Sequence, residues 1–382
     1  MELYIHIPFC RQKCRYCSFV SFTGQENNYE AYIDLLLKEA SLRTEEVCEP
    51  IRTVYIGGGT PSLLPSFLFT KLLMGLNQII DLRAVTEFTA EANPGTVDSE
   101  WLDIAVRYGI NRLSFGLQAG QDRLLRLLGR IHTMDDVAQS VHLARKAGIS
   151  NISLDLIFGL PTQEISEWND TLAYALSLEP LHISAYGLIP EEGTPLFDDL
   201  QNQRISLPDP DTEREMYGTA VSILQKHGFQ RYEISNFARK GYECIHNIGY
   251  WTQVPYIGLG VSAASMTELH DGPEGLSYRR RTNPETLKAY RNMIDGRFVG
   301  CNDEQITPEA ARFETMMLSL RMSQGISEEI FLKKHRISLE QCYGIKLNEM
   351  EKNGLMLHEN GRWKLTDRGF DIQNSILVEL ME

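Results

Sequence analysis

The first half of the chain alternates between two patterns of hydrophobic positions. Short runs rich in β-branched and aromatic residues are each followed by a longer segment with apolar residues at helical spacing. The predicted strands cover residues 3–7, 53–56, 87–90, 112–116, 151–157 and 182–188. The predicted helices cover residues 29–43, 65–77, 98–108, 122–128, 135–147 and 166–178. Six such units in a row predict a parallel sheet that is closed or partly closed into a barrel.

The segments of unusual composition all follow predicted strands. They are the cysteine-rich IHIPFCRQKCRYCSF after the first strand, then GGGTPS, EANPG, FGLQ and FGLPTQ after the second to the fifth. In β/α barrels the functional site lies at the carboxyl ends of the strands. We therefore expect these five segments to meet at one rim of the barrel.

The hydrophobic pattern changes after residue 200. Residues 201–211 are rich in Pro and Asp and predict a linker or loop, residues 213–227 predict a helix, and residues 230–234 predict a strand. From about residue 307 the chain is helical again, and LMLHENGRWKLT predicts a β-hairpin wing between two helices. We predict three domains: a barrel over residues 1–200, a barrel extension over 201–300, and a C-terminal winged-helix-like domain over 301–382.

Composition and charge narrow the classes of partner. Of the 382 residues, 43% are hydrophobic and 23% charged, which is typical of globular proteins. The formal net charge of −14 argues against nucleic acid as the main partner, because phosphate binding needs a basic face. From residue 301 onward there are 14 acidic and 10 basic residues, so the predicted wing favours packing or partner docking over DNA binding.

The N-terminus and the cysteine content predict a cytoplasmic protein. A strand predicted from residue 3 leaves no room for a signal peptide, and no stretch reaches the roughly 18 apolar residues of a membrane span. The seven cysteines are an odd number and are irregularly spread beyond the first three. This usage fits a reducing compartment, where clustered cysteines more often bind metal than form disulfides.

Three cysteines lie within one short predicted loop. Cys10, Cys14 and Cys17 have the spacing C-x3-C-x2-C, with no obvious fourth ligand beside them. Three thiolates suit an iron–sulfur cluster that leaves one iron open to another ligand. Two alternatives stay open: buried structural thiols, and a structural zinc site, which needs four ligands and would recruit His6 or Cys48.

The cysteine spacing at this position resembles that of the radical S-adenosylmethionine (SAM) superfamily, in which Tyr16 matches the aromatic residue before the third cysteine. The resemblance implies a [4Fe-4S] cluster on the three cysteines, with the amino and carboxylate groups of SAM on the open iron. It also implies SAM contacts at Tyr4, Gly58, Gly59, Thr60, Glu91, Gln118, Arg130, Asp155 and Ala264. Taken singly, the charged residues of this set fit helix caps or surface ion pairs better.

The motifs YIHIPFC, GGGTPS, FGLQ, DLIFGLP and GLGVSA extend the resemblance over nearly the whole chain. Together they are similar to the oxygen-independent coproporphyrinogen III oxidase family, which implies an α/β fold with a partial (β/α)6 barrel and a C-terminal helical, winged-helix-like domain. Two departures argue against oxidase activity. Phe19 stands where the oxidases carry a fourth cysteine, and the arm that precedes their first strand is missing.

A further motif, H-N-x-x-Y-W, is formed by His246, Asn247, Tyr250 and Trp251. It resembles the signature of the HemW heme chaperones, which are relatives of the oxidases. Chemically, His246 is a candidate axial ligand of heme iron. The alternative is a hydrogen-bonded core histidine beside a packed Tyr/Trp pair. The three arginines at residues 279–281 are candidate partners for heme propionates, with a solvated turn as the alternative.

Two functions therefore stay open at the level of sequence. The first is a heme chaperone that binds heme and transfers it to acceptor proteins, some of them at the membrane, and that carries the cluster and SAM without porphyrinogen turnover. The second is an oxygen-independent coproporphyrinogen III oxidase. For the chaperone, the resemblance also implies transient membrane association and is consistent with a homodimer. A zinc-stabilised scaffold is a third hypothesis.

Overall fold

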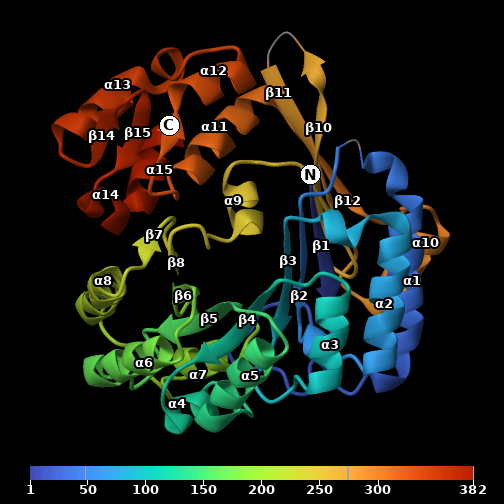
Figure 1. Ribbon diagram of the computed structural model, residues 1–382. Coiled ribbons are helices and arrows are strands. Elements are labelled where there is room, and N and C mark those ends of the chain that lie inside the picture. The colour runs from blue at the N-terminus through green and yellow to red at the C-terminus, as the bar shows by residue number, and fades with distance from the viewer. Residues whose placement is uncertain (48, 273–274, 382) are drawn as a thin grey trace.

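The computed structural model describes residues 1–47, 49–272 and 275–381, and its central feature is one mixed sheet (Figure 1). Within those residues the sheet has 12 strands, in the order β12-β11-β10-β9-β1-β2-β3-β4-β5-β6-β8-β7. The parallel strands β1 to β6 are Glu2–Ile7, Thr53–Gly58, Glu87–Ala92, Arg112–Gln118, Asn151–Phe158 and His182–Gly187. All six predicted strands are confirmed within two residues at each end, as is their parallel pairing.

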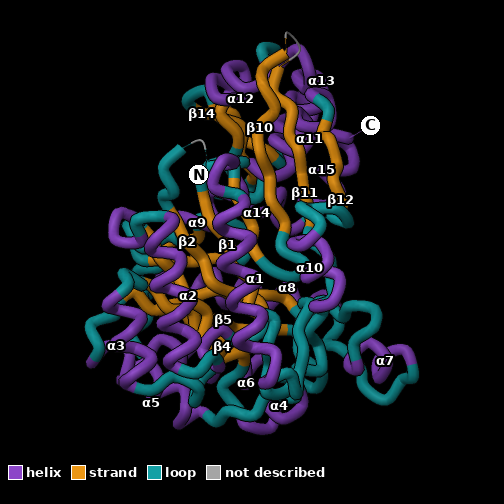
Figure 2. The backbone as a smooth tube through the Cα atoms, turned by 90° about the vertical axis from the view of Figure 1, so that its right-hand side faces the viewer, coloured by secondary structure: helices purple, strands orange, loops and turns teal. Residues whose placement is uncertain are grey.

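Helices cover the outer face of the parallel strands, as Figure 2 shows for α1, α2 and α3. Helices α1 to α6 are Tyr29–Leu42, Ser66–Ile79, Ser99–Arg107, Asp122–Leu127, Met134–Lys146 and Ile165–Ser177, each within two residues of its prediction. Short 3-10 helices lie at Glu26–Asn28, Thr44–Glu46, Pro61–Leu63 and Leu82–Ala84. The apolar stripes pack into one core, in which the Phe69 and Trp101 rings stack with centroids 4.4 Å apart.

The sheet extends beyond β1 in a way that the sequence pattern does not predict. Strand β9, Tyr256–Leu259, pairs in parallel with β1, and three antiparallel strands follow it: β10 Ala264–Gly272, β11 Gly275–Thr282 and β12 Asn302–Ile306. At the opposite edge lie β7 Gln230–Arg231 and β8 Asn236–Ala238. The helices of this region are α7 Pro195–Gln201, α8 Pro210–Lys226, α9 Ile245–Trp251 and α10 Leu287–Asp295.

The strand predicted over residues 230–234 is wrong beyond Arg231. Glu233 instead closes a turn, in which its carboxylate accepts a hydrogen bond from the Ser235 N–H at 3.0 Å. The Tyr232 N–H donates to the Asn236 carbonyl across the same turn at 3.2 Å. The predicted helix over residues 213–227 is confirmed as α8.

The C-terminal residues build a smaller unit with its own core, which includes Met316, Leu347 and Trp363. Its helices are α11 Pro308–Ser319, α12 Glu328–His335, α13 Leu339–Lys352, α14 Asp367–Asp371 and α15 Gln373–Met381. Its strands are β13 Ile326–Ser327, β14 Met356–Glu359 and β15 Arg362–Leu365. The predicted hairpin wing is confirmed as β14 and β15, whereas the domain boundaries at residues 200 and 300 stay a prediction.

No helix in the described part of the chain is long and apolar enough to span a membrane.

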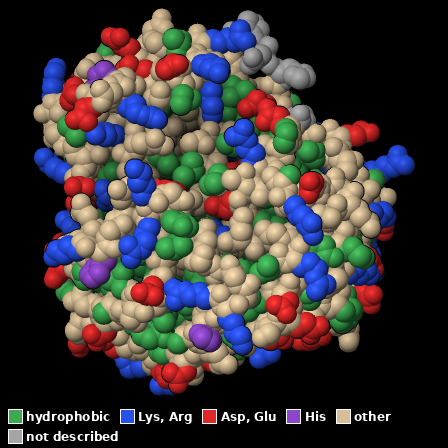
Figure 3. Space-filling model, in the orientation of Figure 1, with side chains coloured by type: hydrophobic (Ala, Val, Ile, Leu, Met, Phe, Trp, Pro, Cys, Tyr) green, Lys and Arg blue, Asp and Glu red, His purple; other side chains and the backbone are tan. Residues whose placement is uncertain are grey.

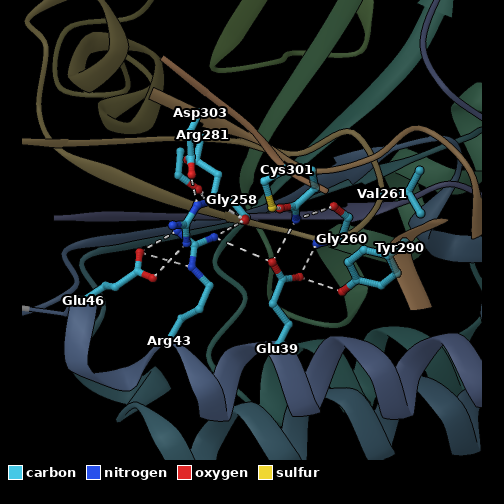
Figure 4. Close-up of polar contacts among 12 residues, drawn as sticks. Glu39, Arg43, Glu46, Gly258, Gly260, Val261, Arg281, Tyr290, Cys301 and Asp303 are labelled. Carbon is cyan, nitrogen blue, oxygen red and sulfur yellow. Dashed lines mark hydrogen bonds and ion pairs between the residues drawn. The ribbon is translucent and has the colours of Figure 1, made fainter. Parts of the chain in front are cut away.

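A buried ion pair ties α1 to the sheet extension (Figure 4). Glu39 is fully buried, and it accepts hydrogen bonds from the Tyr290 hydroxyl at 2.6 Å and the Gly260 N–H at 2.8 Å. Arg43, one turn later, is also buried and donates to the Gly258 carbonyl at 2.9 Å. Burial raises the pKa of Glu39, and these donors act against that rise. The network fixes the end of β9, from which GLGVSAAS leads into β10.

We expect Glu39→Ala to lower the free energy of unfolding by about 3 kcal/mol, because the Arg43 guanidinium would stay buried without this counterion. Urea unfolding followed by circular dichroism measures the loss. Glu30→Ala on the same helix is the matched control, because Glu30 pairs with Lys71 at the surface and its removal should leave stability close to wild type. Equal losses in the two variants would contradict a stabilising role for the buried network.

Candidate functional site

The cysteine loop lies at the carboxyl end of β1 and is held there by its own backbone. The Cys10 N–H donates to the Phe22 carbonyl at 2.9 Å, and the Arg15 N–H donates to the Leu128 carbonyl at 2.9 Å. The Arg15 side chain also forms an ion pair with Asp199. The loop carries three half-buried free thiols, those of Cys10, Cys14 and Cys17.

Four of the five unusual segments meet around one cavity of about 420 Å³ at the carboxyl ends of the parallel strands, whereas no residue of FGLPTQ, residues 158–163, lines it. Most of the predicted cofactor residues line it: Cys10, Cys14, Cys17, Tyr16, Gly58, Gly59, Thr60, Glu91, Gln118, Arg130 and Asp155. Their convergence follows from the parallel register, because each residue ends or follows a neighbouring strand. We refer to this space as the cysteine cavity.

Polar side chains surround the sulfur atoms. An Arg130 guanidinium nitrogen lies 3.5 Å from Cys14 Sγ, and the Thr60 hydroxyl lies 3.8 Å from Cys10 Sγ. Asn93 joins the two, because it accepts from Arg130 at 2.8 Å and donates to Thr60 at 2.9 Å. A cation and a hydroxyl donor beside thiolates suit an anionic cluster, since hydrogen bonds to the sulfurs and nearby charge tune such centres.

The arrangement favours a cluster over a single zinc ion. Among the residues that the structure describes, no three His, Cys, Asp or Glu side chains converge closely enough to hold one metal ion. His6, a candidate fourth ligand, is hydrogen-bonded instead to the Tyr4 hydroxyl at 2.9 Å and the Val20 carbonyl at 2.8 Å. Cys48 lies outside the described residues. Thiolates that bind separate irons of one cluster lie farther apart than thiolates that share one ion, so three thiols that do not converge on one point fit a cluster better.

The glycine turn after β2 brings backbone close to the cysteine loop. Gly58 has φ = +114°, and a Cβ at Gly59 would lie 2.7 Å from the Phe9 carbonyl oxygen and 3.0 Å from Cys10 Sγ. Only glycine fits both positions without displacing the loop. The Gly58 N–H donates to the Glu91 carboxylate at 3.1 Å, which fixes that side chain at the cavity wall.

Two half-buried carboxyl groups, those of Glu91 and Asp155, line the cysteine cavity. Burial, together with the charge of Asp155, raises the pKa of Glu91 to about 7. Burial likewise raises the pKa of Asp155, against hydrogen bonds from Ser184 and Ser114. The Tyr55 hydroxyl donates to Glu91 at 2.9 Å. Carboxyl groups in this setting can accept hydrogen bonds from ribose hydroxyls or an ammonium group.

A second cavity of about 720 Å³ adjoins the first. The two share a wall made of Phe19, Tyr55, Gly58, Glu91 and Asn247. The remaining predicted residues, apart from Trp251, line this second space, which we refer to as the aromatic cavity: Tyr4, Ala264, His246, Asn247 and Tyr250. Figure 3 shows hydrophobic side chains gathered in the hollowed middle of one face, between the C-terminal part and the barrel.

The predicted motif residues lie on different sides of α9. His246, Asn247 and Tyr250 line the aromatic cavity. Trp251 packs away from it, with the Arg321 guanidinium carbon 5.3 Å from the ring centroid. His246 is buried, and both its ring nitrogens are hydrogen-bonded, so coordination of iron would require one of these bonds to open. Burial and the charge of Arg112 lower the pKa of His246 to about 3, which keeps the imidazole neutral.

Sequence reasoning missed the residues that hold α9 in place. Glu87, at the start of β3, accepts from the N–H groups of Ile245 and His246 at 2.9 and 3.0 Å and so caps the helix N-terminus. Glu2, at the start of β1, is buried against Gly249, where an added Cβ would collide with the Glu2 carboxylate. In the sequence, each of these glutamates is an acidic first residue of a largely apolar strand. That pattern is the signal that could have identified them.

The three arginines at residues 279–281 are not in a turn. They lie on β11, where cross-strand pairing places them beside acidic residues of β12. Arg279 and Arg281 bond to Asp303 at 2.7 and 3.0 Å, and Arg280 bonds to Glu314 at 2.8 Å. Of the three arginines, Arg280 lines the aromatic cavity and the other two do not. Arg280 is therefore the one candidate partner for a heme propionate that remains among them.

We expect Gly249→Ala to destabilise the protein by about 2 kcal/mol, because the new methyl group would push Glu2 out of its buried position. Gly218→Ala is the matched control, since Gly218 is also helical and has open space around its Cβ position. That change should be neutral or slightly stabilising, as alanine is the better helix former. Urea unfolding of both variants measures the difference, and similar stabilities would contradict the close packing of α9 on β1.

Comparison with known proteins identifies the family and the fold. The profile of the radical SAM superfamily matches residues 4–175, and that of the HemN C-terminal domain matches residues 306–372. The solved structure of coproporphyrinogen III oxidase (HemN) from Escherichia coli has a TM-score of 0.83 and 22% identity, covering 99% of this chain and 89% of that chain. At this identity the match shows a shared fold, and it confirms the predicted α/β fold class.

Sequence relatives are more informative about the family. The heme chaperone HemW of Bacillus subtilis is 35% identical over 98% of this chain and 97% of its own length. The heme chaperone HemW of Escherichia coli is 33% identical over 99% of this chain and 97% of its own length. With a radical SAM match, a HemN C-terminal match and these full-length relatives, the chain belongs to the HemW family within the radical SAM superfamily.

Proposed function

We propose that this protein is a heme chaperone, which binds heme, passes it to acceptor proteins, and carries a SAM-ligated [4Fe-4S] cluster. The observation that carries the proposal is the pair of adjoining cavities. One gathers the three cysteines and most of the predicted SAM contacts. The other is lined by His246, Asn247 and Tyr250 of α9, together with Tyr4 and Ala264. Relatives named heme chaperone HemW over the full chain support the same function.

The cysteine cavity suits the cluster and SAM. Cys10, Cys14 and Cys17 would hold three irons, and Arg130 would sit beside the cluster and reach the SAM carboxylate as a bidentate donor. The glycine turn offers backbone to the methionine part. Glu91, held by hydrogen bonds from the Tyr55 hydroxyl and the Gly58 N–H, would accept from a hydroxyl or ammonium group of SAM. When reduced, such a cluster supplies an electron that can cleave SAM to a 5′-deoxyadenosyl radical.

The aromatic cavity suits a flat macrocycle with one polar edge. Its volume of about 720 Å³ lies within the usual range for cofactor sites, roughly 300–1,000 Å³. Tyr4, Tyr55, Tyr256 and Met266 offer apolar and aromatic surface to a macrocycle face. Arg280 supplies a guanidinium for a propionate, although Glu314 competes for it.

One residue favours the chaperone over the oxidase. Phe19, in the position where the oxidases carry a fourth cysteine, is 65% exposed and lies at the wall shared by the two cavities. A phenyl ring there cannot take the place of a thiol in a reaction. We therefore propose that the protein does not convert porphyrinogen. From the family resemblance we add heme acceptors at the membrane, a cytoplasmic location with transient membrane association, and a homodimer, which sedimentation analysis tests.

We expect Cys10→Ala, Cys14→Ala and Cys17→Ala each to abolish the cluster, because the remaining two thiolates cannot hold three irons. Iron and sulfide analysis of anaerobically reconstituted protein, with the visible absorption spectrum, measures this. Cys342→Ala is the matched control, since Cys342 is a half-buried cysteine of the C-terminal core. A full iron content in the triple alanine variant would remove the cluster from the proposal.

Heme titration and a turnover assay test the function itself. We expect saturable one-to-one heme binding and no protoporphyrinogen IX when the reconstituted protein meets coproporphyrinogen III, SAM and reductant. Ala264→Trp, which fills the aromatic cavity, should weaken heme binding at least tenfold. Ala84→Trp, at an exposed position, should leave it unchanged. Multiple-turnover product would identify an oxidase instead, and equal affinities in the two variants would exclude the aromatic cavity.

A further inference from the structure

A buried histidine lies behind the arginine that faces the cysteine loop. His132 is 6% exposed, and its ring lies between the Arg130 side chain and a backbone carbonyl of β4. Arg130 Nε lies 3.3 Å from His132 Nδ1, and the Leu117 carbonyl oxygen lies 3.3 Å from His132 Nε2. The ring therefore joins β4 to Arg130, of which a guanidinium nitrogen lies 3.5 Å from Cys14 Sγ.

The direction of both hydrogen bonds is fixed by their outer partners. An arginine Nε–H group can only donate, so His132 Nδ1 must carry a lone pair. A carbonyl oxygen can only accept, so Nε2 must carry the one ring hydrogen. The ring is therefore a neutral imidazole that connects Arg130 to Leu117. Burial and the charge of Arg130 lower the pKa of His132 to about 4, which agrees with the neutral form.

A β-bulge in β4 holds both side chains. The register of β4 against β5 shifts between Gly116 and Gln118, which leaves Leu117 as the extra residue of the bulge. The Gly116 carbonyl accepts from Arg130 at 3.0 Å, and the next carbonyl, that of Leu117, accepts from His132. Two successive carbonyl groups of one strand thus fix the histidine and the arginine relative to each other.

The partners of Arg130 leave its positive charge directed at sulfur. Its guanidinium bonds to His132, to Asn93 and to the Gly116 carbonyl, which are all uncharged, and it lies beside Cys14. None of these partners is a carboxylate, although the chain has a formal net charge of −14. An aspartate or glutamate in place of His132 would hold the same side chain but would neutralise its charge.

The same arginine orders a second donor beside the cysteine loop. Because the Asn93 side-chain oxygen accepts from Arg130 at 2.8 Å, the Asn93 amide nitrogen is the group that donates to Thr60, at 2.9 Å. The Thr60 hydroxyl donates its own hydrogen to Cys10 Sγ, 3.8 Å away. One guanidinium therefore sets a donor at each of two cysteine sulfurs, its own at Cys14 and the Thr60 hydroxyl at Cys10.

We propose that His132 is a positioning residue that aims the Arg130 guanidinium at the Cys14 sulfur. By this route it raises the reduction potential of a cluster on the three cysteines, because hydrogen bonds and positive charge at the sulfurs stabilise the reduced, more negative form. The effect on the potential rests on the cluster of the proposed function, whereas the positioning of Arg130 does not. Heme binding is not involved in either.

The positioning of Arg130 is tested on cluster-free protein by 1H–15N spectra of the arginine Nε–H groups. The Arg130 signal is assigned by its loss in Arg130→Gln, and we expect it to be protected from exchange with water in wild type. His132→Leu removes both ring nitrogens and should abolish the protection. His132→Asn should keep it, since the amide oxygen takes the place of Nδ1 as acceptor. Equal protection in wild type and His132→Leu would contradict the positioning role.

The effect on the cluster is tested by redox titration of the reconstituted protein, followed by the EPR signal of the reduced cluster. His132→Leu should lower the equilibrium constant for one-electron reduction about tenfold, which is a fall of about 59 mV. His132→Asn should stay at the wild-type potential. His142→Leu is the matched control, because it makes the same change at an exposed histidine of α5, and it should have no effect. An unchanged or raised potential in His132→Leu overturns the proposal.

A double-variant cycle separates positioning from a merely structural role. Arg130→Gln should lower the potential at least as far as His132→Leu does. If His132 acts through Arg130, adding His132→Leu to Arg130→Gln causes no further fall, whereas additive falls reveal an independent effect and refute the proposed route. If wild type takes up no iron on reconstitution, the cluster and the effect on its potential fail together, and the arginine spectra alone decide the positioning role.

Discussion

The parallel alignment of β1 to β6 is the constraint on which the rest of the structure depends. Because all six strands point the same way, their carboxyl ends meet at one rim, and the loops that leave them are forced together. Residues more than a hundred positions apart, such as Cys14 and Arg130, become neighbours at 3.5 Å for this reason. The same alignment places the amino ends of β1 and β3 under α9, where Glu2 and Glu87 are buried.

Much of the fold and of the cysteine cavity follows from the sequence. The spacing of hydrophobic residues predicts the six strands and six helices of the barrel. Because sites in such folds lie at the carboxyl ends of the strands, the cysteines, the glycine turn and Glu91 are then expected to lie together. These are local patterns combined with one general rule of topology. The predicted roles of the individual side chains are chemical statements, which the placement of those side chains supports but does not test.

The sheet extension and the support of α9 could not be predicted in this way. β9 pairs with β1 across some 250 residues of chain, and a four-residue strand has no period strong enough to identify it. His246 and Tyr250 form a motif in the sequence, but their neighbours Thr53 and Glu2 lie on β2 and β1, far away along the chain. Such buried polar pairs depend on tertiary contacts, and in the sequence they resemble ordinary polar residues at strand ends.

The two cavities share a wall, so an occupant of one is in contact with the side chains that shape the other. Iron-edge anomalous diffraction from crystals of the reconstituted, heme-loaded protein tests this account most directly. The account predicts two separate iron sites: a four-iron cluster on Cys10, Cys14 and Cys17 in the cysteine cavity, and a single heme iron in the aromatic cavity. A heme iron located outside the aromatic cavity, or no iron on the three cysteines, would contradict it.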